Sequence, residues 1–169
     1  MTAWPTRHMS GVPPAAVMLL TTPFVGGLEA GWTAYPPLSV VTQTGQTFFN
    51  LAIITVGLTS ILGALNFLVT IVCMRAPGMT WGRLPVFVGS MFVTSWLALL
   101  YTQGFATAML MVTLDRIGGM SFFDASNGGD PLLYEHVFWF YSHPAVYIMV
   151  IPGFGIALEV IAHFSRKPF

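Results

Sequence analysis

Residues 136–155 read HVFWFYSHPAVYIMVIPGFG, a run apolar enough for a lipid bilayer that still contains two histidines, two tyrosines and two prolines. Ionisable side chains inside a membrane helix are costly, and they usually mark a functional site. At about 100° per residue, the side chains that fall within roughly 60° of His143 are those of His136, Trp139, Val146, Tyr147 and Val150. The stretch therefore predicts a membrane helix with imidazole, phenol and indole groups gathered on one face.

The opposite face of the same predicted helix carries Tyr141 and Ala145. Pro144 has no N–H group, so the carbonyl of Phe140 loses its usual helical partner and we expect a kink there. Pro152 repeats this effect further along the helix. Freed carbonyls close to a histidine and a tyrosine suit a metal or proton site, since surrounding groups must satisfy them in a membrane.

Composition assigns the whole chain to the membrane proteins. Of its 169 residues, 55% are hydrophobic and only 7% are charged, whereas a soluble domain typically contains about 25% charged residues. The formal net charge of zero gives no support to a nucleic-acid partner, and we expect none. The lipid bilayer is the expected surrounding.

Four segments qualify as membrane spans, each of which needs about 20 mostly apolar residues. The expected spans are residues 13–31, 47–74, 84–114 and 131–163. The first is the weakest, because it contains Pro23 and Glu29. We therefore expect an all-α integral membrane helical bundle with four transmembrane helices, forming a single membrane domain over residues 1–169.

Loop charges predict the orientation of a multi-pass protein, since positive residues favour the cytoplasmic side. If the spans alternate, the positive residues on one side are Arg7, Arg75, Arg83, Arg166 and Lys167. Only Arg116 falls on the other side, beside Asp115, Asp124 and Asp130. Both termini are therefore predicted to be cytoplasmic.

A polar stripe follows the second expected span. Its members at helical spacing are Thr55, Thr59, Asn66 and Thr70, with Ser60 adjacent. Such a stripe can hold a water chain that carries protons. It can equally serve hydrogen bonding between helices, which is common for these residue types in membrane bundles and is favoured on the stripe alone.

The run LLYEHVFWFYSHPAVYIMVIPGFG, residues 132–155, resembles the sixth transmembrane helix of subunit I of the heme–copper terminal oxidases. Three further segments resemble other parts of that subunit. Residues 60–90 resemble helix four and the loop that follows it. Residues 31–39 (GWTAYPPLS) resemble the loop over the heme propionates, and residues 121–134 resemble the loop that leads into helix six. The chain is thus similar to helices three to six of a twelve-helix subunit.

The resemblance implies a role for each site residue. His143 would be one of three histidine ligands of the active-site copper, and Tyr147 would be a catalytic tyrosine joined covalently to it. Trp32 would donate a hydrogen bond to a propionate of the high-spin, oxygen-binding heme, while Trp139 and Val146 would line the pocket or the oxygen route. The residues matching the family's proton channel from the cytoplasm are Thr59, Ser60 and Asn66.

One position departs from the commonest subclass of the family, where a glutamate passes protons to the active site. Here that position is Ala145. A second subclass has a YSHP motif, and this chain matches it with Tyr141, Ser142 and His143. In that subclass a tyrosine hydroxyl replaces the carboxylate. Side chains four residues apart on a helix can project toward the same spot, as those of Tyr141 and Ala145 would, so Tyr141 is the expected proton donor.

The implied function is that of part of the catalytic subunit of a respiratory terminal oxidase, which reduces O2 to water and pumps protons in a bacterial plasma membrane. The expected partners are the remainder of subunit I, subunits II and III, and cytochrome c or quinol as electron donor. The family's ligands of the low-spin heme, and two of its three copper-binding histidines, have no counterpart in this sequence. We therefore expect the chain to be a fragment that is inactive on its own. Two alternatives stay open: a nitric-oxide-reductase-like relative, which lacks the tyrosine, and a non-catalytic four-helix membrane or assembly protein, in which His143 is structural.

Overall fold

The computed structural model describes residues 8–166, and every regular element in that range is helical. The all-α prediction is therefore confirmed. The elements in chain order are η1 (His8–Gly11), α2 (Val12–Thr21), η2 (Thr22–Val25), α3 (Leu38–Val41), α4 (Thr44–Cys73), η3 (Trp81–Arg83), α5 (Val86–Gly118), η4 (Ala125–Asn127) and α6 (Pro131–Ser165). The predictions that concern Arg7 and Lys167 lie outside the described residues.

Within the described residues, three helices have the length and composition to cross a membrane: α4 with 30 residues, α5 with 33 and α6 with 35. The first expected span, residues 13–31, instead forms the shorter apolar segment Val12–Val25. It ends there because Gly26 and Gly27 adopt positive φ angles of 110° and 71°, which turn the chain out of the helix.

Local chemistry explains where α6 starts. Pro131 occupies its first turn, and the Asp130 side chain accepts a hydrogen bond of 2.9 Å from the Leu132 N–H. An N-cap carboxylate satisfies an amide that has no partner inside the helix. From there α6 runs without interruption through Pro144 and Pro152 to Ser165.

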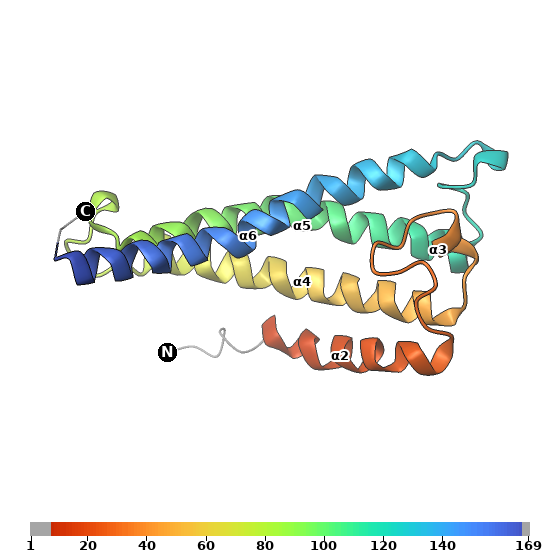
Figure 1. Ribbon diagram of the computed structural model, residues 1–169, viewed down its shortest axis with the longest axis horizontal. Helices are drawn as coiled ribbons and strands as arrows, with labels where there is room; N and C mark the ends of the chain where they lie inside the picture. Colours follow the sequence, from red (N-terminus) through yellow and green to blue (C-terminus); the bar gives the residue numbers. More distant parts are fainter. Residues whose placement is uncertain (1–7, 167–169) are drawn as a thin grey trace.

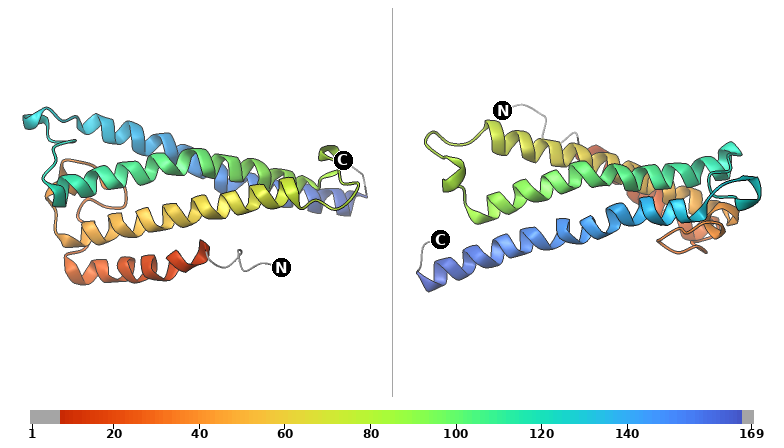
Figure 2. Two further views of the ribbon diagram at one scale, coloured as in Figure 1. Left: turned by 180° about the vertical axis from the view of Figure 1, so that it is seen from behind. Right: turned by 90° about the horizontal axis from the view of Figure 1, so that it is seen from above.

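The helices form an open row in which α5 lies between α4 and α6 and packs along both, while α2 covers one part of α4 (Figures 1 and 2). Because α5 is the main neighbour of α6, much of the α6 surface is exposed. That surface includes the face that carries His143.

The core lies at one end of the row, where the loops before α4 and after α5 meet α6 (Figure 1). The buried residues of this cluster are Ala34, Phe49, Ala108, Met109, Val112, Phe123, Tyr134 and Phe138. Most of these side chains are apolar or aromatic, so their burial holds both loops against the helices.

Two charged residues at the end of α5 fasten the same loops. The Asp115 carboxylate accepts hydrogen bonds from the backbone N–H groups of Phe122 and Phe123, each at 3.0 Å. Arg116 donates to four backbone carbonyls and two hydroxyls, which belong to Ser39, Val40, Thr42, Gln43 and Thr47. The positive charge of Arg116 therefore holds the turn between α3 and α4.

Candidate functional site

His143 and Tyr147 stand one turn apart on the exposed face of α6. Their ring centroids are 4.8 Å apart, and the planes meet at 79° in an edge-to-face contact. Trp139 and Val146 lie on this face as well, and their exposed fractions are 48% and 58%. The helical period thus presents an imidazole, a phenol and an indole together on a surface that no other helix within residues 8–166 covers.

The loop that follows Gly27 is attached to the first half of α6 by hydrogen bonds and ring contacts. Tyr134 donates from its hydroxyl to the Thr33 carbonyl at 2.7 Å, and Trp139 donates from its indole nitrogen to the Tyr35 hydroxyl. The Tyr35 ring also meets Phe138 edge to face, with centroids 6.0 Å apart. These contacts fix the orientation of Trp139 beside the His143 face.

Trp32 lies in the same loop, and its ring centroid is 5.9 Å from that of Phe138. Its side chain is 62% exposed, so the indole can donate a hydrogen bond to a group outside this chain. His136 is exposed too, and its Nδ1 atom lies 2.9 Å from the Leu132 carbonyl oxygen of its own helix.

Tyr141 projects from the other side of α6, toward α5. Its ring stacks on Phe105 of α5, with centroids 4.8 Å apart and planes at 15°. Ser142 donates to the Phe138 carbonyl at 2.9 Å. The structure therefore separates Tyr141 from His143 and Tyr147, and places it in the interface between α5 and α6.

The polar stripe on α4 is partly covered by the N-terminal segment. A Cβ atom built on Gly11 would lie 2.4 Å from the Thr59 methyl group and 3.5 Å from that of Thr55. The hydroxyls of Thr55 and Thr59 donate to carbonyls of their own helix, at 2.8 Å each. Ser60 is exposed and Asn66 is half-buried, so both can still meet water or a further helix.

The donor set for a metal is incomplete in this part of the chain. Across residues 8–166, no three His, Cys, Asp or Glu side chains are grouped so that they could hold a metal ion. His143 is nevertheless suited to be a single ligand, because its imidazole is exposed on an unpartnered helix face and copper accepts imidazole readily. Any centre at His143 needs ligands from outside the described residues.

Sequence reasoning missed Tyr35 and Tyr134 as supports of this surface, and it missed the partners of Asp115 and Arg116. The Trp139–Tyr35 and Tyr134–Thr33 hydrogen bonds join positions 104 and 101 residues apart. The local signal in the sequence was the pair of aromatic residues, Trp32 and Tyr35, beside two prolines in this loop.

Comparison with known proteins gives consistent results. The family described as "Cytochrome C and Quinol oxidase polypeptide I" matches residues 1–169. Proteins named cytochrome c oxidase subunit 1 are 50% identical in Thermostichus vulcanus and 48% identical in Synechocystis, in each case over 92% of this chain. The protein of that name from Cereibacter sphaeroides is 50% identical over 84% of the chain. The chain spans between 25% and 28% of the length of these relatives.

Proposed function

Because the chain belongs to the cytochrome c and quinol oxidase polypeptide I family, we propose that it forms part of the catalytic subunit of a respiratory terminal oxidase. That enzyme would reduce O2 to water and couple the reaction to proton pumping in a bacterial plasma membrane. The observation that carries the proposal is the contact of the His143 and Tyr147 rings on an exposed face of a membrane-length helix.

Two residues of this chain would hold the cofactors. His143 would bind the active-site copper through one ring nitrogen, together with ligands from the remainder of subunit I. Trp32 would donate its indole hydrogen to a propionate of the high-spin heme, and its exposure permits this. When bound, copper and heme supply the oxygen-binding site and electrons. Ligands of the low-spin heme would also lie outside the described residues.

Tyr147 would provide a proton and an electron at the reaction centre. Its phenol lies against the His143 ring, as a covalent bond between the two rings requires. Such a bond would fix the orientation of the imidazole and hold the phenol beside it. Trp139 and Val146 flank this pair and would exclude bulk water from it, which strengthens local electrostatic interactions.

Tyr141 would deliver protons from the α5–α6 interface, where its ring stacks on Phe105. Thr59, Ser60 and Asn66 would line the channel that feeds it, with Ser142 beside the delivery point. In the intact oxidase, Tyr141→Phe should slow the proton-coupled steps, and adding Ala145→Glu should restore part of the rate. Normal turnover and pumping in Tyr141→Phe would remove Tyr141 from the route.

The exposed α6 face supports the remainder of subunit I as the nearest partner, which would cover His143 and Tyr147. Subunits II and III, and either cytochrome c or quinol as electron donor, complete the proposed assembly.

A matched pair of variants tests the copper assignment. His143→Ala and His136→Ala each remove one exposed imidazole from the same helix, but only the first removes the ring that contacts Tyr147. In the purified intact oxidase, His143→Ala should lose copper and oxygen consumption and keep its place in the membrane, since insertion follows apolar content. His136→Ala should keep its copper. Full copper content in His143→Ala would refute the assignment.

A further inference from the structure

At the end of the row opposite the aromatic core, the guanidinium of Arg75 lies flat over an indole. Its central carbon is 4.0 Å from the centroid of the Trp81 ring, within the range of a cation–π interaction. Within residues 8–166 the Nη1 atom of Arg75 is buried and has no hydrogen-bond partner. A buried donor of a charged group without an acceptor is costly, and an anion beside the half-buried Arg75 guanidinium would offset part of that cost.

The same indole lines an apolar groove of about 540 Å³ between α5 and α6. Phe92 stands next to Trp81, with ring centroids 5.1 Å apart, and the line of rings continues to Trp96. The groove is bounded on its other side by Ile151, Phe154 and Leu158 of α6. Val93 and Phe154 remain exposed on it. A long hydrocarbon chain fits a trough of this composition.

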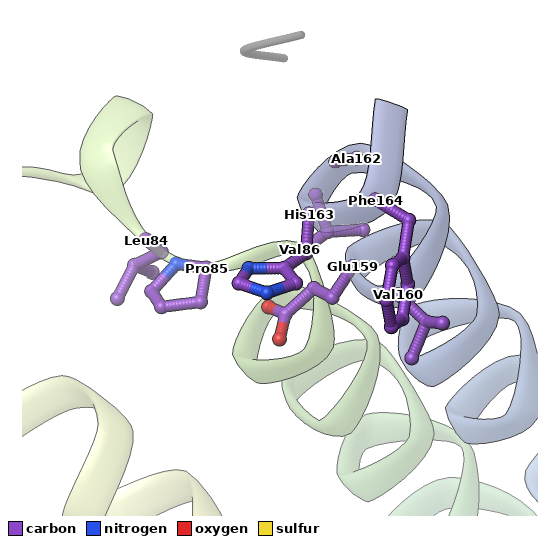
Figure 3. Close-up of a pocket in the computed structure, with 8 residues that line it drawn as sticks. All are labelled: Leu84, Pro85, Val86, Glu159, Val160, Ala162, His163 and Phe164. Carbon is purple, nitrogen blue, oxygen red and sulfur yellow. The ribbon is translucent and has the colours of Figure 1, made fainter. Parts of the chain in front are cut away.

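A second cavity of about 570 Å³ adjoins the groove and shares Leu84, Pro85 and Val86 with it (Figure 3). It contains Glu159 and His163. The Glu159 carboxylate accepts a hydrogen bond of 2.9 Å from the Phe87 N–H, so this acid is already engaged at the start of α5.

The charge at this end of the row is positive. Arg75 and Arg83 belong to the loop between α4 and α5, Arg166 ends α6, and Glu159 is the one acid among the described residues there. Arg83 is exposed and follows Trp81 by two positions. Two arginines beside an exposed tryptophan, at the end of membrane-length helices, are typical of contact with anionic headgroups.

We propose that this corner binds an anionic phospholipid. Its phosphodiester would lie beside the half-buried guanidinium of Arg75 and accept a hydrogen bond from Arg83, and one acyl chain would lie along Trp81 and Phe92 in the groove. The ligand must combine a charged acceptor with a long apolar chain, because the unpaired guanidinium and the apolar groove share one indole as their common wall.

The test uses the purified intact oxidase in nanodiscs that contain phosphatidylglycerol and phosphatidylcholine with the same acyl chains. Native mass spectrometry then measures which lipid is retained. Arg75→Gln should lower the retention of phosphatidylglycerol by about fivefold, the expected effect of one arginine at a lipid surface. Arg166→Gln is the matched control, since it removes the same charge at the same end without touching Trp81, and it should retain the lipid.

A second variant, Val93→Trp, fills the groove and leaves the arginines unchanged. It should reduce retention of phosphatidylglycerol to a similar degree, and the heme absorption spectrum of each variant reports whether the oxidase has assembled. Equal losses of phosphatidylglycerol retention in Arg75→Gln and Arg166→Gln would mean that the lipid is attracted by the overall positive charge, and would overturn the proposed site. Unchanged retention in Val93→Trp would mean that another part of the oxidase covers the groove, and would overturn it as well.

Discussion

Gly155 is a point of close approach between α5 and α6, and replacing it with alanine tests the packing that orients α6. A Cβ atom at this position would lie 2.2 Å from the Ser90 Oγ atom, 2.9 Å from the Ser90 Cβ atom and 3.1 Å from the Phe87 Cα atom. Rotation of Ser90 relieves only the first contact. The other two involve Cβ and backbone atoms, so the helices themselves must separate.

The magnitude follows from three contributions. Overpacking of this kind costs about 1–3 kcal/mol. Separation of the helices also stretches the 2.9 Å hydrogen bond between the Phe87 N–H and Glu159, and hydrogen bonds to charged groups are worth about 1.5–3 kcal/mol. The gain in helix propensity from glycine to alanine offsets about 0.5–1 kcal/mol. Gly155→Ala should therefore lower the free energy of unfolding by about 2–4 kcal/mol, since the hydrogen bond is only partly lost.

Gly153 provides the control two residues earlier in α6. A Cβ atom built there meets nothing within 4 Å, so Gly153→Ala should be neutral or stabilise by up to about 1 kcal/mol. Both variants would be unfolded in the intact subunit with increasing denaturing detergent, followed by circular dichroism. Adding Ser90→Ala to Gly155→Ala should recover part of the loss. If the two alanine variants were equally stable, the close crossing at Gly155 would be refuted.

Three further predictions concern the loops. Arg116→Gln should lower the free energy of unfolding by about 3 kcal/mol in the same assay, because the carbonyls of Ser39, Thr42 and Gln43 lose a charged donor. An unchanged unfolding transition would contradict the role of Arg116 in holding the turn between α3 and α4. Hydrogen bonds from the Ser126 hydroxyl and N–H, and then from Asn127, lower the pKa of Asp124. The Asp124 carboxylate therefore contributes fully to loop stability above its ordinary pKa of about 4, and this contribution is lost as the pH falls through the lowered pKa. Protease cleavage of the loop should rise in strong acid. The variant Asp124→Asn should abolish this dependence of cleavage on pH. With Cys73 replaced by serine, Thr80→Cys should be labelled from the cytoplasmic side and Ser126→Cys from the outside; labelling of position 80 from outside would reverse the orientation.

The regular periodicity of the long helices made them readable from sequence. Uncharged runs between Thr47 and Met74 and between Leu84 and Leu114 correspond to α4 and α5. The 3.6-residue period also separates the His143 face of α6 from Tyr141, which the structure places against Phe105 of α5. Local sequence was less informative at Gly26 and Gly27, where two left-handed residues end the first helix before the expected boundary.

Contacts between distant positions were beyond sequence reasoning. Charge counting treated Arg116 as a marker of orientation, but its hydrogen-bond partners lie 69 to 77 positions away, and they give it a structural role. Glu159 likewise accepts a hydrogen bond in the first turn of α5, from the Phe87 N–H, which lies 72 positions earlier in the chain. Such pairings depend on how the helices are laid side by side, and no local pattern encodes that arrangement.

The mass of the peptide that contains His143 and Tyr147 tests the central claim most directly. Their rings lie in contact, with centroids 4.8 Å apart, and the proposed function joins them by a covalent bond that removes one hydrogen from each ring. This is a two-electron oxidation, and O2, the substrate of the proposed oxidase, would accept the two electrons and two protons. In the active, fully metallated oxidase, mass spectrometry of this peptide should show a loss of two hydrogens, and the Tyr147→Phe variant should show none and should not turn over. An unmodified wild-type peptide from enzyme with full copper content and full activity would contradict the account.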